Sequence, residues 1–119
     1  MDTMTKAILI NSTARTITEH TIDTWRDISP AIGCEMFTCV TLTKQGETAY
    51  VDDQGLLRQP KAFIKFASYP QPLAGNVLIL GTDSMGESID TSLSVEEVGR
   101  MVDFLNIDDI RKMVIDRAL

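Results

Sequence analysis

The sequence predicts an α+β domain: a mostly antiparallel sheet, one short helix after the second strand, and a C-terminal αα-hairpin. Three observations predict it. Residues 6–11 and 76–80 are apolar on both faces, which is typical of central strands. Alternating segments follow one another through short turns, which favours antiparallel pairing. The last third carries apolar residues at helical spacing.

The chain has 119 residues, of which 44% are hydrophobic and 24% charged. These values are close to the averages for globular proteins, and the length is enough for one domain to bury a core. We therefore expect a single domain over residues 1–119, with a sheet region over 6–81 and a helical hairpin over 93–119.

The first elements are a hairpin and a helix. Residues 6–11 form the first strand, residues 11–14 are turn-forming, and residues 15–22 alternate with Thr and Ile, which favour β-structure. Asp23 or Thr24 then caps a short helix that is broken by Pro30 and ended by Gly33.

A second hairpin follows, from two alternating segments over residues 35–43 and 48–52 joined by a turn at 44–47. Asp52 to Gly55 is a further turn, in which Gly55 is free to adopt positive φ. Strand, helix and irregular structure remain open for residues 56–66. The strand over 76–80 is closed by Gly81, and residues 82–92 have the composition of a mobile loop.

Ser94 and Glu97 form a capping box at the start of the predicted C-terminal hairpin. One helical stripe follows, made of Val95, Val98, Met101, Val102 and Leu105. Asn106 ends that helix, and a second helix turns Ile107, Ile110, Val114 and Ala118 inward. Further apolar positions on both helices predict a surface for a partner or for a homodimer.

Negative charge is concentrated late in the chain. The net charge is −6, and residues 82–119 hold nine acidic against four basic side chains. Such a surface repels phosphates, so no direct nucleic-acid partner is expected. The apolar run over 77–80 is too short to span a membrane, and the N-terminus lacks the features of a signal peptide, which predicts a cytoplasmic protein.

No catalytic residue, metal site or cofactor is predicted. His20 is the only histidine and has no recognisable Ser or Cys partner. Cys34 and Cys39 are interpreted as small buried hydrophobes. The adjacent carboxylates of Asp52 and Asp53 before a glycine are typical of a turn.

The acidic residues of the last third are instead the predicted partner-binding surface. They lie in the loop before the predicted helices and on those helices. The predicted contacts are Asp83, Glu87, Asp90, Glu96 and Asp103.

Two segments carry a resemblance. Residues 50–57 read Tyr-Val-Asp-Asp-Gln-Gly-Leu-Leu, with Tyr50, Asp52, Asp53 and Gly55 as the motif turn, and residues 75–81 read Gly-Asn-Val-Leu-Ile-Leu-Gly. With the strand at residues 6–10 they resemble an uncharacterised domain family of small phage- and plasmid-borne proteins with a Tyr-x-Asp-Asp/Glu-x-Gly-Leu motif. Pro60 departs from the family's Pro-x-Asn pattern. The resemblance covers residues 6–81 and implies a mobile-element origin but no reaction.

The resulting hypothesis is a non-enzymatic, phage-encoded protein that inhibits a host defence protein through its acidic surface. Complementary potentials would suit a target with a basic nucleic-acid groove. Two alternatives stay open. One is a binder of a small molecule or nucleotide signal that uses an oligomer interface and the loop at 82–92; the other is a metal-dependent hydrolase using Asp52 and Asp53.

Overall fold

The computed structural model describes residues 4–118 and confirms the α+β class with mostly antiparallel strands. One sheet has the order β2-β1-β7-β4-β3, with β8 paired to β7, and the other has the order β6-β5-β9. The strands of the first are β1 (Thr5–Asn11), β2 (Thr16–Ile22), β3 (Phe37–Thr41), β4 (Glu47–Asp52), β7 (Val77–Thr82) and β8 (Ser88–Ile89). Those of the second are β5 (Ala62–Phe66), β6 (Leu73–Ala74) and β9 (Val102–Asn106).

Both predicted hairpins are confirmed. β1 and β2 pair in antiparallel register from Thr5 opposite Ile22 to Asn11 opposite Thr16. β3 and β4 pair from Phe37 opposite Asp52 to Thr41 opposite Thr48. Residues 56–66, left open by the sequence, contain the 3-10 helix η2 (Gly55–Arg58) and strand β5.

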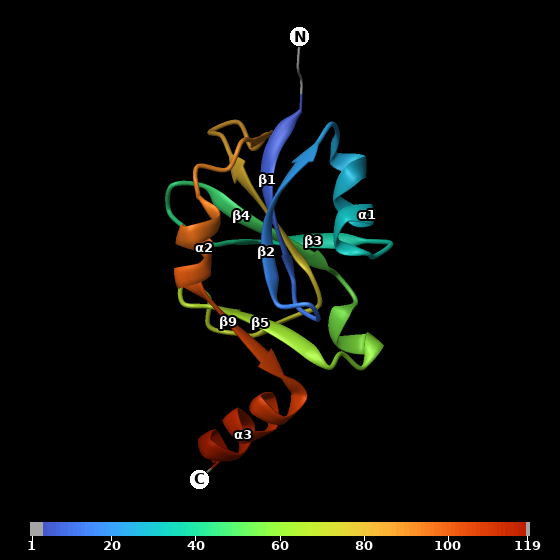
Figure 1. Ribbon diagram of the computed structural model, residues 1–119, viewed down its shortest axis with the longest axis vertical. Helices are drawn as coiled ribbons and strands as arrows, with labels where there is room; N and C mark the ends of the chain where they lie inside the picture. The colour runs from blue at the N-terminus through green and yellow to red at the C-terminus, as the bar shows by residue number, and fades with distance from the viewer. Residues whose placement is uncertain (1–3, 119) are drawn as a thin grey trace.

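Strand β7 is central and buried on both faces, as its apolar run predicted. Val77 and Ile79 join the core cluster shared with β5 and the C-terminal helix α2 (Val95–Met101). Leu78 and Leu80 join the cluster beneath helix α1 (Ile28–Ile32). The large sheet is thus covered by α1 on one face and by the small sheet with α2 on the other (Figure 1).

The short helix after β2 begins and ends as predicted. Thr24 caps the 3-10 helix η1 (Trp25–Asp27), which leads directly into α1. Gly33 ends α1 in the left-handed conformation at φ 78°. Pro30 does not break the helix as expected, because it occupies the first turn, where a missing N–H costs no helical hydrogen bond.

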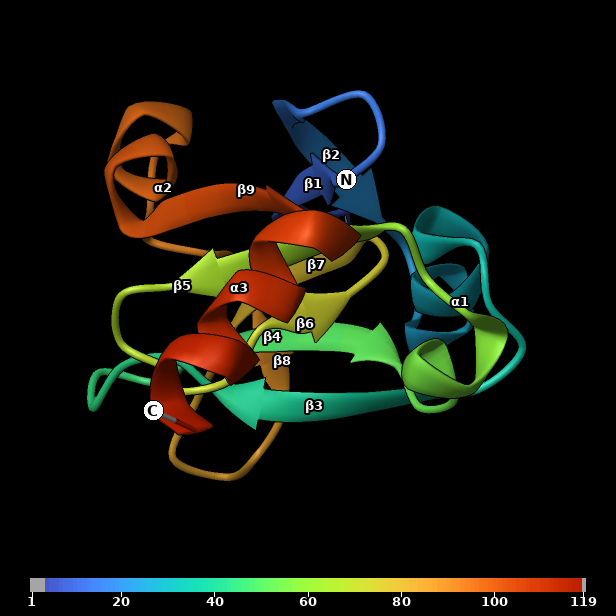
Figure 2. The same cartoon turned by 90° about the horizontal axis from the view of Figure 1, so that it is seen from below.

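The predicted αα-hairpin is wrong in one respect, because strand β9 separates its two helices. Helix α2 starts after the Ser94 capping box, as predicted, but ends at Met101. Strand β9 then pairs with β5, with Val102 opposite Phe66 and Leu105 opposite Phe63. The final helix, α3 (Ile107–Ala118), crosses in front of the small sheet in Figure 2. The predicted inward positions Val114 and Ala118 lie outside the residues whose side chains are described.

The segment over residues 82–92 is not an unstructured loop, and the strands extend beyond residue 81. Gly81 lies within β7 and pairs with Ile89 of β8. The turn between these strands is fixed by the carboxylate of Asp83, which accepts hydrogen bonds from the backbone N–H groups of Met85 and Glu87, both at 2.9 Å. Across the described residues, no helix is long and apolar enough to cross a membrane.

Phe66 should be a main determinant of stability, because its fully buried ring joins the small sheet to the large one. We expect Phe66→Ala to lower the free energy of unfolding by about 3–5 kcal/mol, measured by urea denaturation. The control is Leu57→Ala, since Leu57 is 81% exposed and its truncation should change stability by no more than about 0.5 kcal/mol. Equal stabilities of the two variants would contradict the assigned core.

Candidate functional site

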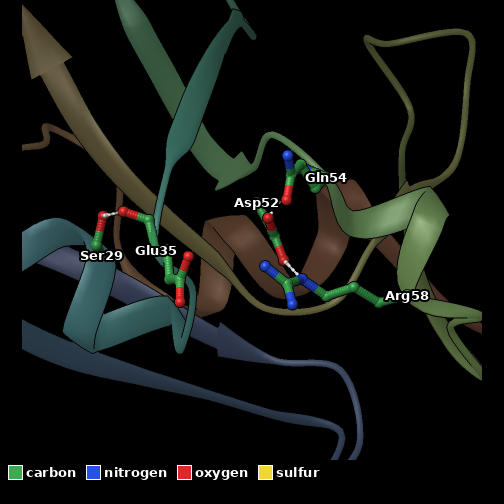
Figure 3. Close-up of polar contacts among 5 residues, drawn as sticks. All are labelled: Ser29, Glu35, Asp52, Gln54 and Arg58. Atoms are coloured by element: carbon green, nitrogen blue, oxygen red, sulfur yellow. Dashed lines mark hydrogen bonds and ion pairs between the residues drawn. The ribbon is translucent and has the colours of Figure 1, made fainter.

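The motif turn follows β4 and is held by the carboxylate of Asp52. Its Oδ1 accepts a hydrogen bond from the backbone N–H of Gln54 at 2.9 Å. Its Oδ2 accepts from Nε of Arg58 at 2.7 Å, so one acid fixes both the turn and the helix η2 that follows (Figure 3). The turn structure predicted for these residues is confirmed.

Gly55 is required in this turn for a reason other than the expected one. The residues with positive φ within the described chain do not include it. A Cβ at Gly55 would instead lie 3.3 Å from both the Cβ and the carbonyl oxygen of Ala74 on β6. The glycine therefore lets η2 approach the small sheet closely.

A pocket of about 240 Å³ opens beside the turn, where four loops converge. The β1–β2 turn supplies Ser12 and Thr13, and the end of α1 supplies Gly33. The motif turn with η2 and the turn before β7 complete the lining; their polar members are Asp52, Arg58 and Asn76. Convergent polar groups in a concave site are typical of ligand-binding pockets.

Hydrogen bonds between distant segments stabilise the pocket wall. Oδ1 of Asn76 accepts from the backbone N–H of Ser12 at 3.0 Å and from its Oγ at 3.4 Å. This ties the β1–β2 turn to the start of β7. The Asp52 side chain is only 12% exposed, whereas that of Arg58 is 50% exposed.

The other motif residues point elsewhere. The ring of Tyr50 packs edge-on against Phe37 at 5.5 Å, and its hydroxyl lies 3.2 Å from Oγ of Ser88. Asp53 is exposed, and its backbone N–H donates to the carbonyl of Met36 at 3.0 Å. The structure thus brings Asp52 and Gly55 into the pocket and leaves Tyr50 and Asp53 outside its lining.

The predicted acidic contacts fall into two groups. Asp83 holds its own turn, and Oδ1 of Asp90 accepts from the backbone N–H of Lys6 at 2.8 Å, so both carboxylates have structural roles. Glu87, Glu96 and Asp103 are exposed, and within residues 4–118 their carboxylates make no hydrogen bond or ion pair. They lie on the β7–β8 turn, α2 and β9.

Sequence reasoning missed a buried acid, Glu47. The sequence pattern predicts a turn at this residue, but Glu47 begins β4 and is only 4% exposed. Its Oε1 accepts hydrogen bonds from the hydroxyl of Thr91 and, at 2.9 Å, from the backbone N–H of Ser92. The acid anchors the segment that leads into α2. Nothing in the spacing of the sequence indicates this contact, because the partners are more than 40 residues apart.

The two thiols differ in their surroundings. Burial raises the pKa of the Cys34 thiol, which keeps it protonated and weakly nucleophilic at neutral pH. Cys34 is only partly buried and Cys39 is exposed, whereas the sequence predicts that both are buried. Among residues 4–118, no three His, Cys, Asp or Glu side chains lie close enough to hold a metal ion.

An apolar groove of about 580 Å³ lies between η2 and α3. Leu56, Phe63, Ile107 and Ile110 line it together with Lys61 and Arg111. Leu56 is 71% exposed at its rim. This groove differs from the spare apolar surface that the sequence predicts on two packed helices, because its lining comes from α3, η2 and β5.

Residues 4–105 match a known family, described as Domain of unknown function (DUF3846). The chain belongs to this family. The match extends beyond the resemblance at residues 6–81 and includes α2 and most of β9, whereas α3 begins after it.

One relative, the Uncharacterized protein y4iR of Sinorhizobium fredii (strain NBRC 101917 / NGR234), is 30% identical over 66 residues. The matched region covers 56% of this chain and 40% of that relative. No solved structure matches.

Gly55→Ala should destabilise the motif turn by about 1–3 kcal/mol, because its methyl group would press on the backbone of Ala74. The matched control is Gly99→Ala on α2, where an added Cβ meets only Ile17, at 3.9 Å. That change should stabilise the protein by about 0.5–1 kcal/mol, since alanine is the better helix former. Thermal and urea unfolding measure both, and a neutral Gly55→Ala would show that the close approach is not needed.

Proposed function

We propose that the protein is a non-catalytic binding protein that acts on another protein through its acidic flank, defined as Asp83, Glu87, Asp90, Glu96 and Asp103. One observation carries the proposal. The β7–β8 turn presents Met85, 83% exposed, and β8 presents Ile89, 45% exposed, close in the chain to Asp83, Glu87 and Asp90. In the view of Figure 1 this turn and α2 both lie to the left, and in Figure 2 they are separated, with α2 beside β9 and the turn beyond β3.

Exposed apolar side chains among acidic side chains are a combination suited to protein interfaces. Apolar side chains supply the area that is removed from water on binding. The carboxylates add complementary potential for a basic partner and speed its approach. The partner we propose is a protein with a basic surface, such as one that itself binds nucleic acid.

The proposal includes a biological setting. The motif at residues 50–57 resembles families carried by phages and plasmids, which supports a phage-encoded protein acting in the host cytoplasm. Inhibition of a host defence protein would then follow from occupation of its basic groove by the acidic flank. A homodimer through α3 belongs to the same proposal, with Ile107 and Ile110 as its apolar contacts.

Absence of catalysis is part of the proposal and has its own test. Asp52, the acid of the motif turn, is held in two hydrogen bonds, and the Cys34 thiol is protonated. We expect no hydrolysis of generic ester, phosphoester or nucleic-acid substrates above the blank. Turnover that disappears in both His20→Ala and Asp52→Ala would overturn the non-enzymatic assignment and favour the hydrolase alternative.

Charge reversal tests the acidic flank. In Glu87→Lys/Glu96→Lys, both changed carboxylates are exposed and unpaired among the described residues. Asp83 and Asp90 are kept for their backbone hydrogen bonds, and Asp103 is kept because it lies opposite Lys65 on β5. Glu97 is kept for its capping role.

We expect the double variant to capture less of a basic partner from host lysate than the parent does, and we expect capture by the parent to weaken with salt.

The matched control is Glu35→Lys/Asp53→Lys, which changes the net charge equally at two exposed acids outside the flank. It should capture the partner nearly as well as the parent. If the folded flank variant and the control retained the same partner equally, the contact surface would have to lie elsewhere.

A further inference from the structure

We propose that the pocket beside the motif turn binds a small organic anion, through a carboxylate or phosphate group held by Arg58 and Asn76. This inference goes beyond the proposed protein-binding function and does not depend on it. The pocket is also distinct from the loop at 82–92, where the sequence alone placed a small-molecule alternative.

Asp52 holds the Arg58 side chain in place but accepts a hydrogen bond from only one of its nitrogens. The carboxylate takes only Nε, at 2.7 Å, and no hydrogen bond to either outer guanidinium nitrogen occurs within the described residues. Figure 3 shows these outer nitrogens on the side of the guanidinium that faces α1 and the β1–β2 hairpin. Two parallel N–H donors match the oxygens of a carboxylate or a phosphate.

Asn76 offers a second donor. Because its Oδ1 accepts from both the N–H and the hydroxyl of Ser12, the orientation of the amide is set and Nδ2 remains available to donate. Thr13, which is exposed, belongs to the same lining. Both oxygens of Asp52 already accept hydrogen bonds. The free groups are therefore mainly donors, which suit a ligand rich in acceptors.

The glycines of the lining leave room beside these donors. Gly33 and Gly75 adopt positive φ, at 78° and 83°, and a Cβ built on either would meet no atom within 4 Å. The backbone therefore turns at Gly33 and at Gly75 without placing a side chain in the pocket.

The volume limits the ligand. The pocket volume of about 240 Å³ is below the roughly 300–1,000 Å³ that is typical of sites for drug-sized ligands. This size favours a small anion over a large ligand. The class is therefore a small organic acid or phosphate monoester.

The test is a ¹H–¹⁵N NMR titration of the whole chain with three probes: inorganic phosphate, succinate and, as the uncharged isostere, succinamide. We expect saturable shifts at millimolar phosphate or succinate, centred on Thr13, Gly33, Arg58 and Asn76, and none with succinamide. The stronger of the two anion responses distinguishes a phosphate from a carboxylate ligand.

Two substitutions at Arg58 make the result specific. Arg58→Gln removes the charge and should weaken binding by at least about tenfold. Arg58→Lys keeps a cation beside Asp52, so it protects the fold, but it lacks the paired donors and should bind several-fold more weakly. The control Arg26→Gln removes an equal charge at an exposed side chain stacked on Trp25 and should leave binding unchanged. Unaltered binding by folded Arg58→Gln, an equal response to succinamide, or no response to either anion would overturn the proposal.

Discussion

The structure depends on the burial of strand β7 on both faces. Val77 and Ile79 pack towards the small sheet, and Leu78 and Leu80 pack towards α1, so one short segment belongs to both core clusters. Its backbone pairs with β1 on one side and β4 on the other. A strand buried on both faces needs cover on each, and the remaining elements supply it.

The loops that leave this sheet determine the candidate site. Asn76 directly precedes β7, Asp52 ends β4, and Ser12 follows β1. These three strands are neighbours in the sheet, so their end loops meet at one edge although they lie far apart in the chain. The local pair of Asp52 and Arg58 is contributed by a single turn, whereas the bond between Ser12 and Asn76 exists only because β1 and β7 pair.

Charge is distributed unevenly over this scaffold. Glu87, Glu96 and Asp103 lie on the β7–β8 turn, α2 and β9, whereas Arg58, Lys61 and Arg111 lie around η2 and α3. The two kinds of surface would attract ligands of opposite charge, which is why the proposed protein partner is basic and the proposed small ligand is an anion. The family match includes the motif turn and α2, so both proposals rest mainly on the part of the chain that belongs to the family.

The sequence by itself determined the elements whose signals are local. The apolar runs of β1 and β7, the two hairpins, the Thr24 and Ser94 caps and the Asp52 turn were all predicted from neighbouring residues, because each depends on short-range hydrogen bonds or on a period of apolar side chains. The pocket was not predicted, since its lining comes from four separate loops.

Only the tertiary structure decided between helix and strand after Met101. Val98 and Val102 have helical spacing, but Val102 and Phe104 also alternate as a strand does, so the sequence fits both periods. The available edge of β5 resolves the ambiguity, because pairing there satisfies the backbone of residues 102–106 and turns Val102 and Phe104 onto the core. The same dependence on distant neighbours explains Gly55, whose need for glycine arises from Ala74 rather than from its own turn.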